Sequence, residues 1–438
     1  MYTNIHYNRV TNQVTLFHDN HEIETFKYEP TFYELDDSNT SSSSSPIKTI
    51  FGKSVRKIKK FSKAESVFET DLDPRLRVLV DRFYDTSEVA KNNICYLDIE
   101  VDTTDQKPTV ALANNKITCI GTCLNNQYVL FLLCNPEKEI KYSQPNLIIK
   151  RFTDESEMLL AFARYLKLTH VSIITDYNGD YFDIPYIVNR MSRLGLNYKL
   201  LSPIQEVEIK EESFISIAGI SHLDFLKLYK KYSVNDRSSY KLDAIANVEL
   251  GIGKIQHNGL DNLYEHDIDR FIEYNIRDIE LVQKLEAKLR YIQIAIYLAH
   301  KVHIPYEWIF SQSKIIEGGF FTFFKKNGLV SINKPNRTEQ TEEKIEGAYV
   351  KDPQPGLYKK IIDLDFTSLY PNIIRTLNVS PEKKVGKIAN WKKFLPAFYS
   401  SKNEPDQVVT MTSTNGDVKE INLAKLRTIL EKNNMSIA

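Results

Sequence analysis

The stretch NICYLDIEV, residues 93–101, places two acidic residues inside a run of apolar ones. This pattern predicts a buried strand, and ITCIGTC (117–123) and YVLFLLC (128–134) predict two more. The next segment, ESEMLLAFARYLKL (155–168), has the apolar spacing of a helix. Strands followed by a helix predict an α/β domain that begins near Asn92.

The composition is that of a soluble globular protein. The chain has 438 residues, which favours two or three domains, and 42% of them are apolar. No apolar run approaches the roughly 18 residues of a membrane span, and the first residues do not resemble a secretory signal. We therefore expect a cytoplasmic protein, in whatever cell hosts it, without a membrane partner. The net charge is zero, from 57 basic and 57 acidic residues, so the overall charge gives no support for a nucleic-acid partner.

Four cysteines occur in the chain, at Cys95, Cys119, Cys123 and Cys134. None belongs to a CxxC pair, and no histidine lies close to Cys119 and Cys123 in the sequence. Buried free thiols are therefore favoured over a zinc site.

Residues 1–35 alternate apolar and polar side chains, which is typical of short strands. The polar stretch DDSNTSSSSSP (36–46) is expected to be a flexible loop or linker. The run GKSVRKIKKFSK (52–63) carries six basic residues. Two interpretations remain open for it, a solvated helix face or a surface that contacts phosphates.

The second half of the chain begins with a strongly helical pattern at 262–300, which loosens at 303–345. Gly and Pro punctuate GAYVKDPQPGLYKK (347–360), where we expect a domain boundary. KIIDLD (360–365) predicts a strand followed by a helix, and another amphipathic helix is expected to begin within residues 420–438.

Acidic residues at three distant places could form one site. Asp98 and Glu100 are two apart on the first strand, so their carboxylates share a face and repel each other unless a cation lies between them. Asp183 follows the predicted strand VSIIT, where a helix N-cap is expected, with Pro185 in the first turn. Asp278 lies one helical turn after Tyr274.

Each acid alone has an ordinary explanation, as a solvent-facing strand residue, a helix cap or an exposed helix residue. Together, carboxylates without His or Cys favour Mg²⁺ or Mn²⁺. Two such ions can activate water and stabilise the leaving oxygen of a phosphodiester. Tyr274 could orient the attacking water.

These three elements resemble the exonuclease motifs of the family B DNA polymerases, most closely those of T-even-type phages. The resemblance implies a ribonuclease H-like 3′→5′ proofreading domain that binds two Mg²⁺ or Mn²⁺ ions. It implies that Asp98, Glu100, Asp183 and Asp278 are the metal ligands and that Tyr274 lies beside the water. Lys254, in GIGKIQ, resembles a lysine that the phage enzymes carry near the scissile phosphate.

A further motif lies in DLDFTSLYPNII (363–374), which resembles motif A of the polymerase palm and aligns Asp365 rather than Asp363. The resemblance makes Asp365 a ligand of the catalytic metals and places the backbone of Phe366, Thr367, Ser368 and Leu369 against the triphosphate. It makes Tyr370 the residue that excludes a 2′-hydroxyl. From the residues alone, Thr367 and Ser368 could cap the following helix.

The resemblance also suggests residues that contact DNA. Asn178 occupies a position where the second exonuclease motif usually has an Asn, and Phe182 is a candidate for stacking on an unpaired 3′ end, as is Tyr181. Gly347 and Tyr349 belong to GAYVKDP, which resembles a segment that contacts the template.

Three domains follow from the resemblance. Residues 1–91, completed by about 300–345, form a small mixed N-terminal domain, and residues 92–299 form the exonuclease domain. Residues 346–438 form an incomplete palm with motif A and the start of the fingers. The expected partners are primer-template DNA, a single-stranded 3′ end and dNTP, and the resemblance allows a sliding clamp as a further partner.

Two elements of polymerisation are missing from the sequence, a YGDTDS-type turn and a KxxxNSxYG helix. We therefore expect the N-terminal part of a polymerase, either a split enzyme that a separate C-terminal chain completes or a truncated sequence. Two alternatives remain, a stand-alone 3′→5′ exonuclease with a vestigial palm and a DNA-binding scaffold with an inactive site.

Overall fold

The structure is a computed structural model, and it describes residues 1–36, 47–59, 66–104, 107–210, 214–255, 259–334, 349–377, 386–388, 408–413 and 417–432. The chain divides into two compact units. One comprises Met1–Thr49 and Lys53–Asn333, and the other comprises Ile50–Gly52 and Lys334–Ala438. None of the described helices combines the length and the apolar character needed to cross a membrane.

A six-stranded sheet forms the centre of the first unit, in the order β11-β10-β9-β8-β12-β15. The strands are β8 (Ile94–Val101), β9 (Ile117–Leu124), β10 (Gln127–Leu133), β11 (Leu147–Phe152), β12 (Ile173–Thr175) and β15 (Ser221–His222). β8, β9 and β10 pair antiparallel, whereas the other three pairings in this sheet are parallel. This mixed α/β arrangement is consistent with a ribonuclease H-like fold.

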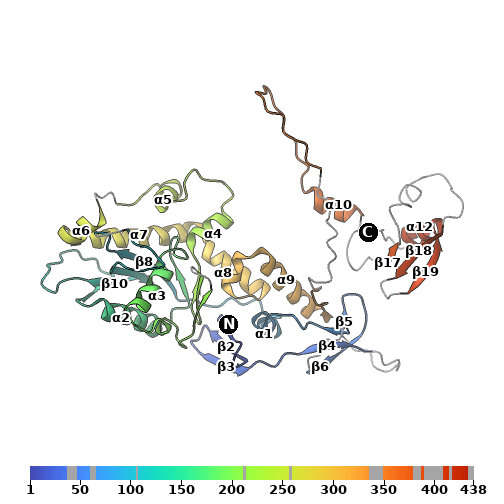
Figure 1. The fold of residues 1–438 in the computed structure, drawn as a ribbon, viewed down its shortest axis with the longest axis horizontal. Helices are drawn as coiled ribbons and strands as arrows, with labels where there is room; N and C mark the ends of the chain where they lie inside the picture. Colours follow the sequence, from blue (N-terminus) through green and yellow to red (C-terminus); the bar gives the residue numbers. More distant parts are fainter. Residues whose placement is uncertain are drawn as a thin grey trace. The chain divides into compact units, whose positions relative to one another are not determined.

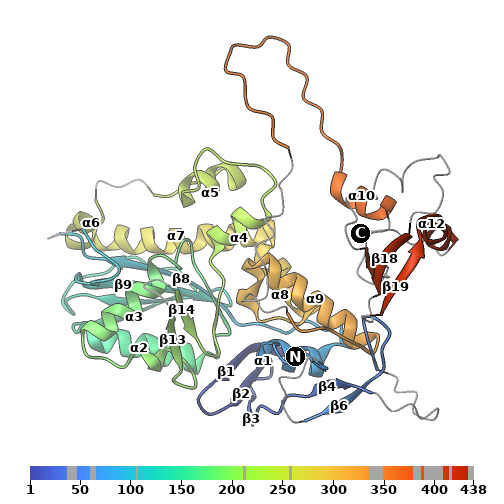
Figure 2. The same cartoon turned by 45° about the vertical axis from the view of Figure 1, so that its right-hand side comes forward.

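Helices cover both faces of this sheet (Figures 1 and 2). α2 (Glu155–Leu168) and α3 (Asp183–Arg193) pack on one face, and the long α7 (Ile268–Leu289) lies along the other. Leu97 and Ile99 of β8 belong to the core beneath α2 and α3. Because side chains alternate along a strand, Asp98 and Glu100 face α7 instead.

The two ends of the first unit meet in the N-terminal part of the fold. β1 (Tyr2–Asn8), β2 (Gln13–His18) and β3 (Ile23–Lys27) form an antiparallel sheet. β16 (Leu329–Val330) pairs with β5 (Lys48–Thr49) although about 280 residues separate them. The remaining elements of this part are β4 (Phe32–Leu35), β6 (Val55–Ile58), β7 (Val67–Phe68), α1 (Pro74–Phe83) and α9 (Gln312–Lys326).

The remaining elements of the first unit lie between α3 and α9 in the sequence and are mostly helical. They are the 3₁₀ helix η1 (Tyr198–Leu201), the hairpin β13 (Val207–Lys210) and β14 (Phe214–Ile217), α4 (Phe225–Tyr232), α5 (Leu242–Leu250), α6 (Leu260–His266), α8 (Tyr291–Val302) and η2 (Tyr306–Phe310). The helical prediction for 262–300 is therefore confirmed, with breaks between α6, α7 and α8.

The second unit contains α10 (Leu369–Leu377) and an antiparallel sheet of β17 (Gly386–Ile388), β18 (Val408–Ser413) and β19 (Val418–Asn422), followed by α12 (Leu423–Lys432). The two predicted helices of this unit are confirmed as α10 and α12. The strand predicted for residues 360–365 is wrong, because this segment pairs with no other strand among the described residues and its Ile361, Ile362 and Leu364 are exposed.

Most of the predicted strands and helices of the first unit are confirmed, including the three strands at 93–134, the short strands at 1–35 and the helix at 155–168. The four cysteines are buried and free, as predicted. The helical interpretation of 52–63 is wrong for the described part, since Val55–Ile58 is a strand that pairs with β4 and Arg56 bonds Glu34 across it. Residues 37–46 of the predicted linker and residues 60–63 of the basic run lie outside the described residues.

Candidate active site

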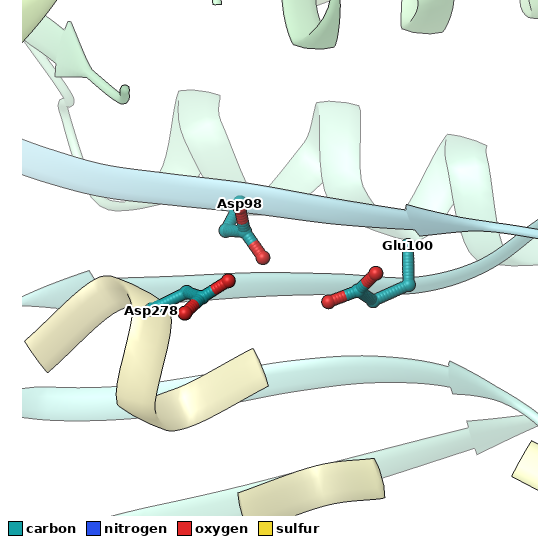
Figure 3. Close-up of side chains that lie close together, drawn as sticks. All are labelled: Asp98, Glu100 and Asp278. Atoms are coloured by element: carbon teal, nitrogen blue, oxygen red, sulfur yellow. The ribbon is translucent and has the colours of Figure 1, made fainter. Parts of the chain in front are cut away.

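Three carboxylates meet between the sheet and α7. Asp98 and Glu100 come from β8 and Asp278 from α7, and one oxygen of each lies within 4.8 Å of the other two. Figure 3 shows the strand acids and the helix acid pointing toward one another. Among the described residues, no other three His, Cys, Asp or Glu side chains each place one metal-ligand atom within 4.8 Å of the other two. The structure thus brings Asp278 together with two acids that precede it by 178 and 180 residues in the sequence.

Asp183 is not one of these three clustered acids and lies beside the edge of β8 that faces β12. The pairing of β12 with β8 ends at Thr175 and Tyr96, so the edge of β8 is open beyond that point. The backbone N–H of Ile99 donates to Asp183 Oδ1 at 3.2 Å there. Asp183 is the first residue of α3 and not its N-cap, which is Phe182, so the capping prediction is wrong. The predicted position of Pro185 in the first turn is confirmed.

Burial and mutual repulsion raise the pKa of these acids. Burial, followed by the charge of Glu100, raises the pKa of Asp98 well above its usual value. Burial and then the charge of Asp278 raise the pKa of Glu100 to about 8. The charge of Asp183 adds to both effects. A cluster of buried acids that resist ionisation together is a favourable place for a divalent cation, because the cation offsets their repulsion.

Lys254 is the cation that the chain itself places at this cluster. Its ammonium donates to Asp278 Oδ2 at 2.5 Å and to the Tyr274 hydroxyl at 3.2 Å. Burial is the largest single effect and opposes the charge of Lys254, but the nearby Asp278, Tyr274 and Asp98 together outweigh it and raise the pKa of the lysine. The Asp243 carboxylate accepts from the Lys254 backbone N–H at 2.7 Å and fixes the end of the loop after α5.

Sequence reasoning missed two residues that support the acids. The Asn275 side chain is fully buried, and its amide donates to Asp98 Oδ2 at 2.7 Å and also hydrogen-bonds Glu100. Gly121 of β9 lies opposite Asp98, and a Cβ there would come within 1.8 Å of Asn275 Oδ1. Asn275 sits inside YNIRD, but only the structure shows that it reaches the strand acids and needs a glycine beside it.

The loop between β12 and α3 carries the expected DNA-end residues. Asn178 has a positive φ of 73°, and its backbone N–H donates to the Asp224 carboxylate. Phe182 packs on Tyr186 with ring centroids 5.3 Å apart, whereas the neighbouring Tyr181 is 60% exposed. Tyr181 therefore presents the more accessible ring beside Asp183.

The motif A residues lie in the second unit. Asp365 precedes α10, and Phe366 and Tyr370 are largely exposed. The Asn372 side chain donates to the Thr367 carbonyl at 3.0 Å, which holds the turn at the start of α10. Of the two residues expected to contact the template, Tyr349 is 90% exposed and Gly347 lies outside the described residues.

Comparison with known proteins places these residues in a family. Residues 21–245 match the exonuclease domain of DNA polymerase family B, and residues 306–432 match DNA polymerase family B. The first match includes Asp98, Glu100 and Asp183, and the second includes Asp365.

Individual relatives agree with the family matches. The chain is 30% identical to the DNA-directed DNA polymerase of Escherichia phage RB69 over 329 residues, which are 68% of this chain and 36% of the relative. It is 31% identical to that of Enterobacteria phage T4 over 246 residues, 54% of this chain and 27% of the relative. It is 29% identical to DNA polymerase 1 of Sulfolobus acidocaldarius over 356 residues, 76% of this chain and 39% of the relative. The matches thus span between 27% and 39% of the length of these three relatives. The chain belongs to DNA polymerase family B.

Proposed function

We propose that this chain removes nucleotides from the 3′ end of single-stranded DNA by metal-dependent hydrolysis. The observation that carries the proposal is the convergence of Asp98, Glu100 and Asp278 on one point, with oxygens within 4.8 Å of one another. A phosphodiester is unreactive and negatively charged, and hydrolysis of one requires concentrated positive charge. The family membership supports DNA as the substrate.

The donor set fits Mg²⁺ or Mn²⁺, because all of its members are hard oxygen ligands. Asp98, Glu100 and Asp278 would hold the ions, with Asp183 contributing from the edge of β8. Two ions held by these residues would supply an activated water and would stabilise the charge on the leaving 3′ oxygen.

The chain's own groups orient the water and the phosphate. Burial raises the pKa of Tyr274, so its hydroxyl keeps its proton and can donate a hydrogen bond to the attacking water. Lys254 holds Asp278 and the Tyr274 hydroxyl in one arrangement and brings a positive charge toward the phosphate. These roles follow from the contacts of both residues with Asp278.

The unpaired DNA end is expected to lie against the loop between β12 and α3. Tyr181 offers an exposed ring for stacking, and Asn178 and Phe182 flank it. Exposed basic residues such as Lys53 and Lys57 can contact phosphates farther away.

The second unit is proposed to serve DNA synthesis. Asp365 would bind the catalytic metals, the backbone of Phe366 to Leu369 would face the triphosphate of a dNTP, and Tyr370 would lie under the sugar. Residues 1–91 with about 300–345, 92–299 and 346–438 are the proposed N-terminal, exonuclease and palm domains. Synthesis on a primer-template requires the YGDTDS-type and KxxxNSxYG motifs from outside these 438 residues, and addition of a polypeptide that carries them should give primer extension that Asp365→Ala abolishes.

Digestion of a single strand labelled at its 5′ end tests the exonuclease directly. With Mg²⁺ the chain should produce a ladder that shortens from the 3′ end, and EDTA should stop it. Asp98→Ala should abolish digestion, whereas Asp236→Ala, which changes an exposed loop aspartate, should leave it unchanged. A folded chain that binds Mn²⁺ but leaves the strand intact would refute the proposal.

A further inference from the structure

His222 lies between two carboxylates, one at each nitrogen of its ring. Nε2 is 2.7 Å from Asp176 Oδ2, and Nδ1 is 2.7 Å from Asp180 Oδ1. A neutral imidazole has one N–H and one lone pair, so it can donate to only one of two such acceptors. With both carboxylates ionised, the geometry favours the doubly protonated imidazolium, which can donate to both at once. Burial opposes this charge, but the two aspartates outweigh burial and raise the pKa of His222.

The two aspartates belong to the loop between β12 and α3. We call residues Asp176–Phe182 the β12–α3 loop. His222 ends the neighbouring strand β15, which pairs parallel with β12. Asp176 also accepts from the Gly179 backbone N–H at 3.1 Å, and a Cβ at Gly179 would collide with the Asp176 carboxylate. The imidazolium thus joins both ends of a tightly folded loop to the edge of the sheet.

The β12–α3 loop leads directly into Asp183. The charge of Asp176 raises the pKa of Asp183, second only to burial, while the charge of His222 lowers it. The imidazolium therefore offsets a buried negative charge that would otherwise repel a metal-ligand candidate. Leaving a buried carboxylate without its partner is strongly unfavourable, so loss of the imidazolium should displace this loop.

The two carboxylates differ in how much they depend on His222. Asp180 also forms an ion pair with the ammonium of Lys227. His222 and Lys227 together lower the pKa of Asp180 to about 2, although burial opposes this. Asp176 is only 1% exposed, and His222 is the one cation with which it pairs among the described residues. Two further charged groups near this bridge are the acids Asp224 and Glu307, and neither can neutralise the charge of Asp176.

We propose that His222 is a positioning residue of the exonuclease site, which holds the β12–α3 loop, and through it Tyr181 and Asp183, in the arrangement that receives the DNA end. It acts through Asp176 and Asp180 and contacts neither the three clustered acids nor, in this proposal, the DNA. The inference rests on the proposed exonuclease function for its purpose, but the bridge itself can be tested without catalysis.

The first test measures hydrogen exchange of the β12–α3 loop. In His222→Gln, which keeps one hydrogen-bond donor but loses the charge, the amides of residues 176–183 should lose protection. Protection should return in part in His222→Gln with Asp176→Asn, because the second change removes the unpaired buried charge. His266→Gln, at an exposed histidine of α6, should leave the loop unchanged. Equal protection in His222→Gln and the unmodified chain would overturn the proposal.

Nitrogen NMR of labelled histidine tests the charge state. Both ring nitrogens of His222 should remain protonated at pH 8, where an ordinary histidine is neutral. A single protonated nitrogen at pH 8 would overturn the bridge. If His222→Gln does not fold, Asp180→Asn tests the bridge from its more exposed side and should reduce loop protection, and unchanged protection there would count against the proposal.

The last test separates binding from chemistry in strand digestion. His222→Gln should lower kcat/KM about tenfold, as expected for a residue that orients a metal ligand without binding the metal itself. The effect should appear mainly as a raised KM, and Asp176→Asn should recover part of it. If the unmodified chain does not digest DNA, the proposed function is refuted, while the hydrogen exchange and NMR results still decide the role of His222. Digestion by His222→Gln with unchanged kcat/KM would refute the positioning role alone.

Discussion

The contact between Asn275 and Asp98 gives a quantitative prediction for metal binding. Asn275→Ala removes a buried amide that donates to Asp98 at 2.7 Å and also hydrogen-bonds Glu100. A hydrogen bond to a charged group contributes about 1.5–3 kcal/mol. Because about 1.4 kcal/mol corresponds to a factor of ten, the Kd for Mn²⁺ should rise about 10- to 100-fold.

Titration with Mn²⁺, followed by electron paramagnetic resonance, measures this Kd without DNA. Digestion of single-stranded DNA should slow at low Mn²⁺ and recover largely at saturating Mn²⁺, because the acids themselves are intact. Asn262→Ala, at an exposed asparagine of α6, is the matched control and should bind Mn²⁺ normally. A Kd for Asn275→Ala equal to that of the unmodified chain would show that Asn275 does not position the acids.

Three further predictions concern Gly121 and Lys254 at the acidic cluster and His300 elsewhere in the first unit. Gly121→Ala should weaken Mn²⁺ binding as Asn275→Ala does, because the added Cβ would lie 1.8 Å from Asn275 Oδ1. The double variant should lose less Mn²⁺-binding free energy than the sum of the losses in the two single variants. Strictly additive losses would contradict the contact between Gly121 and Asn275. Lys254→Met should bind Mn²⁺ more tightly, because the substitution removes a cation that competes for Asp278. The same variant should digest DNA about 100-fold more slowly, because it loses the positive charge near the phosphate. Weaker Mn²⁺ binding in this variant would contradict the role of Lys254 as a competing cation. Burial, aided by the charge of His303, lowers the pKa of His300 to about 4, so the folded chain resists a proton that the unfolded chain accepts. Its contribution to stability should therefore be lost as pH falls from about 6.5 toward 4, by up to about 3 kcal/mol, and urea unfolding of His300→Gln should show a flatter pH dependence over that range.

The sequence predicted those parts of the fold that local periodicity determines. The alternation in β8 correctly placed Asp98 and Glu100 on one face, and the helical spacing of α7 correctly placed Tyr274 and Asp278 one turn apart. Each acid alone has an ordinary explanation, and it was the resemblance to the exonuclease motifs that predicted one shared site for Asp98, Glu100 and Asp278.

Contacts between distant segments were not foreseeable in the same way. Asn275 reaches Asp98 across 177 residues, and His222 joins aspartates that become its neighbours only when β12 and β15 pair. α9 was missed because Gly318 and Gly319 lower its helix propensity, whereas in the fold Gly318 allows the helix to approach the Val302 carbonyl. The strand expected at 360–365 needs a pairing partner, which local sequence cannot supply.

Anomalous diffraction from crystals soaked in Mn²⁺ tests the central claim most directly. We predict two manganese peaks among the carboxylates of Asp98, Glu100, Asp183 and Asp278, and their loss in Asp98→Ala. Well-ordered carboxylates with no manganese peak between them would contradict the account.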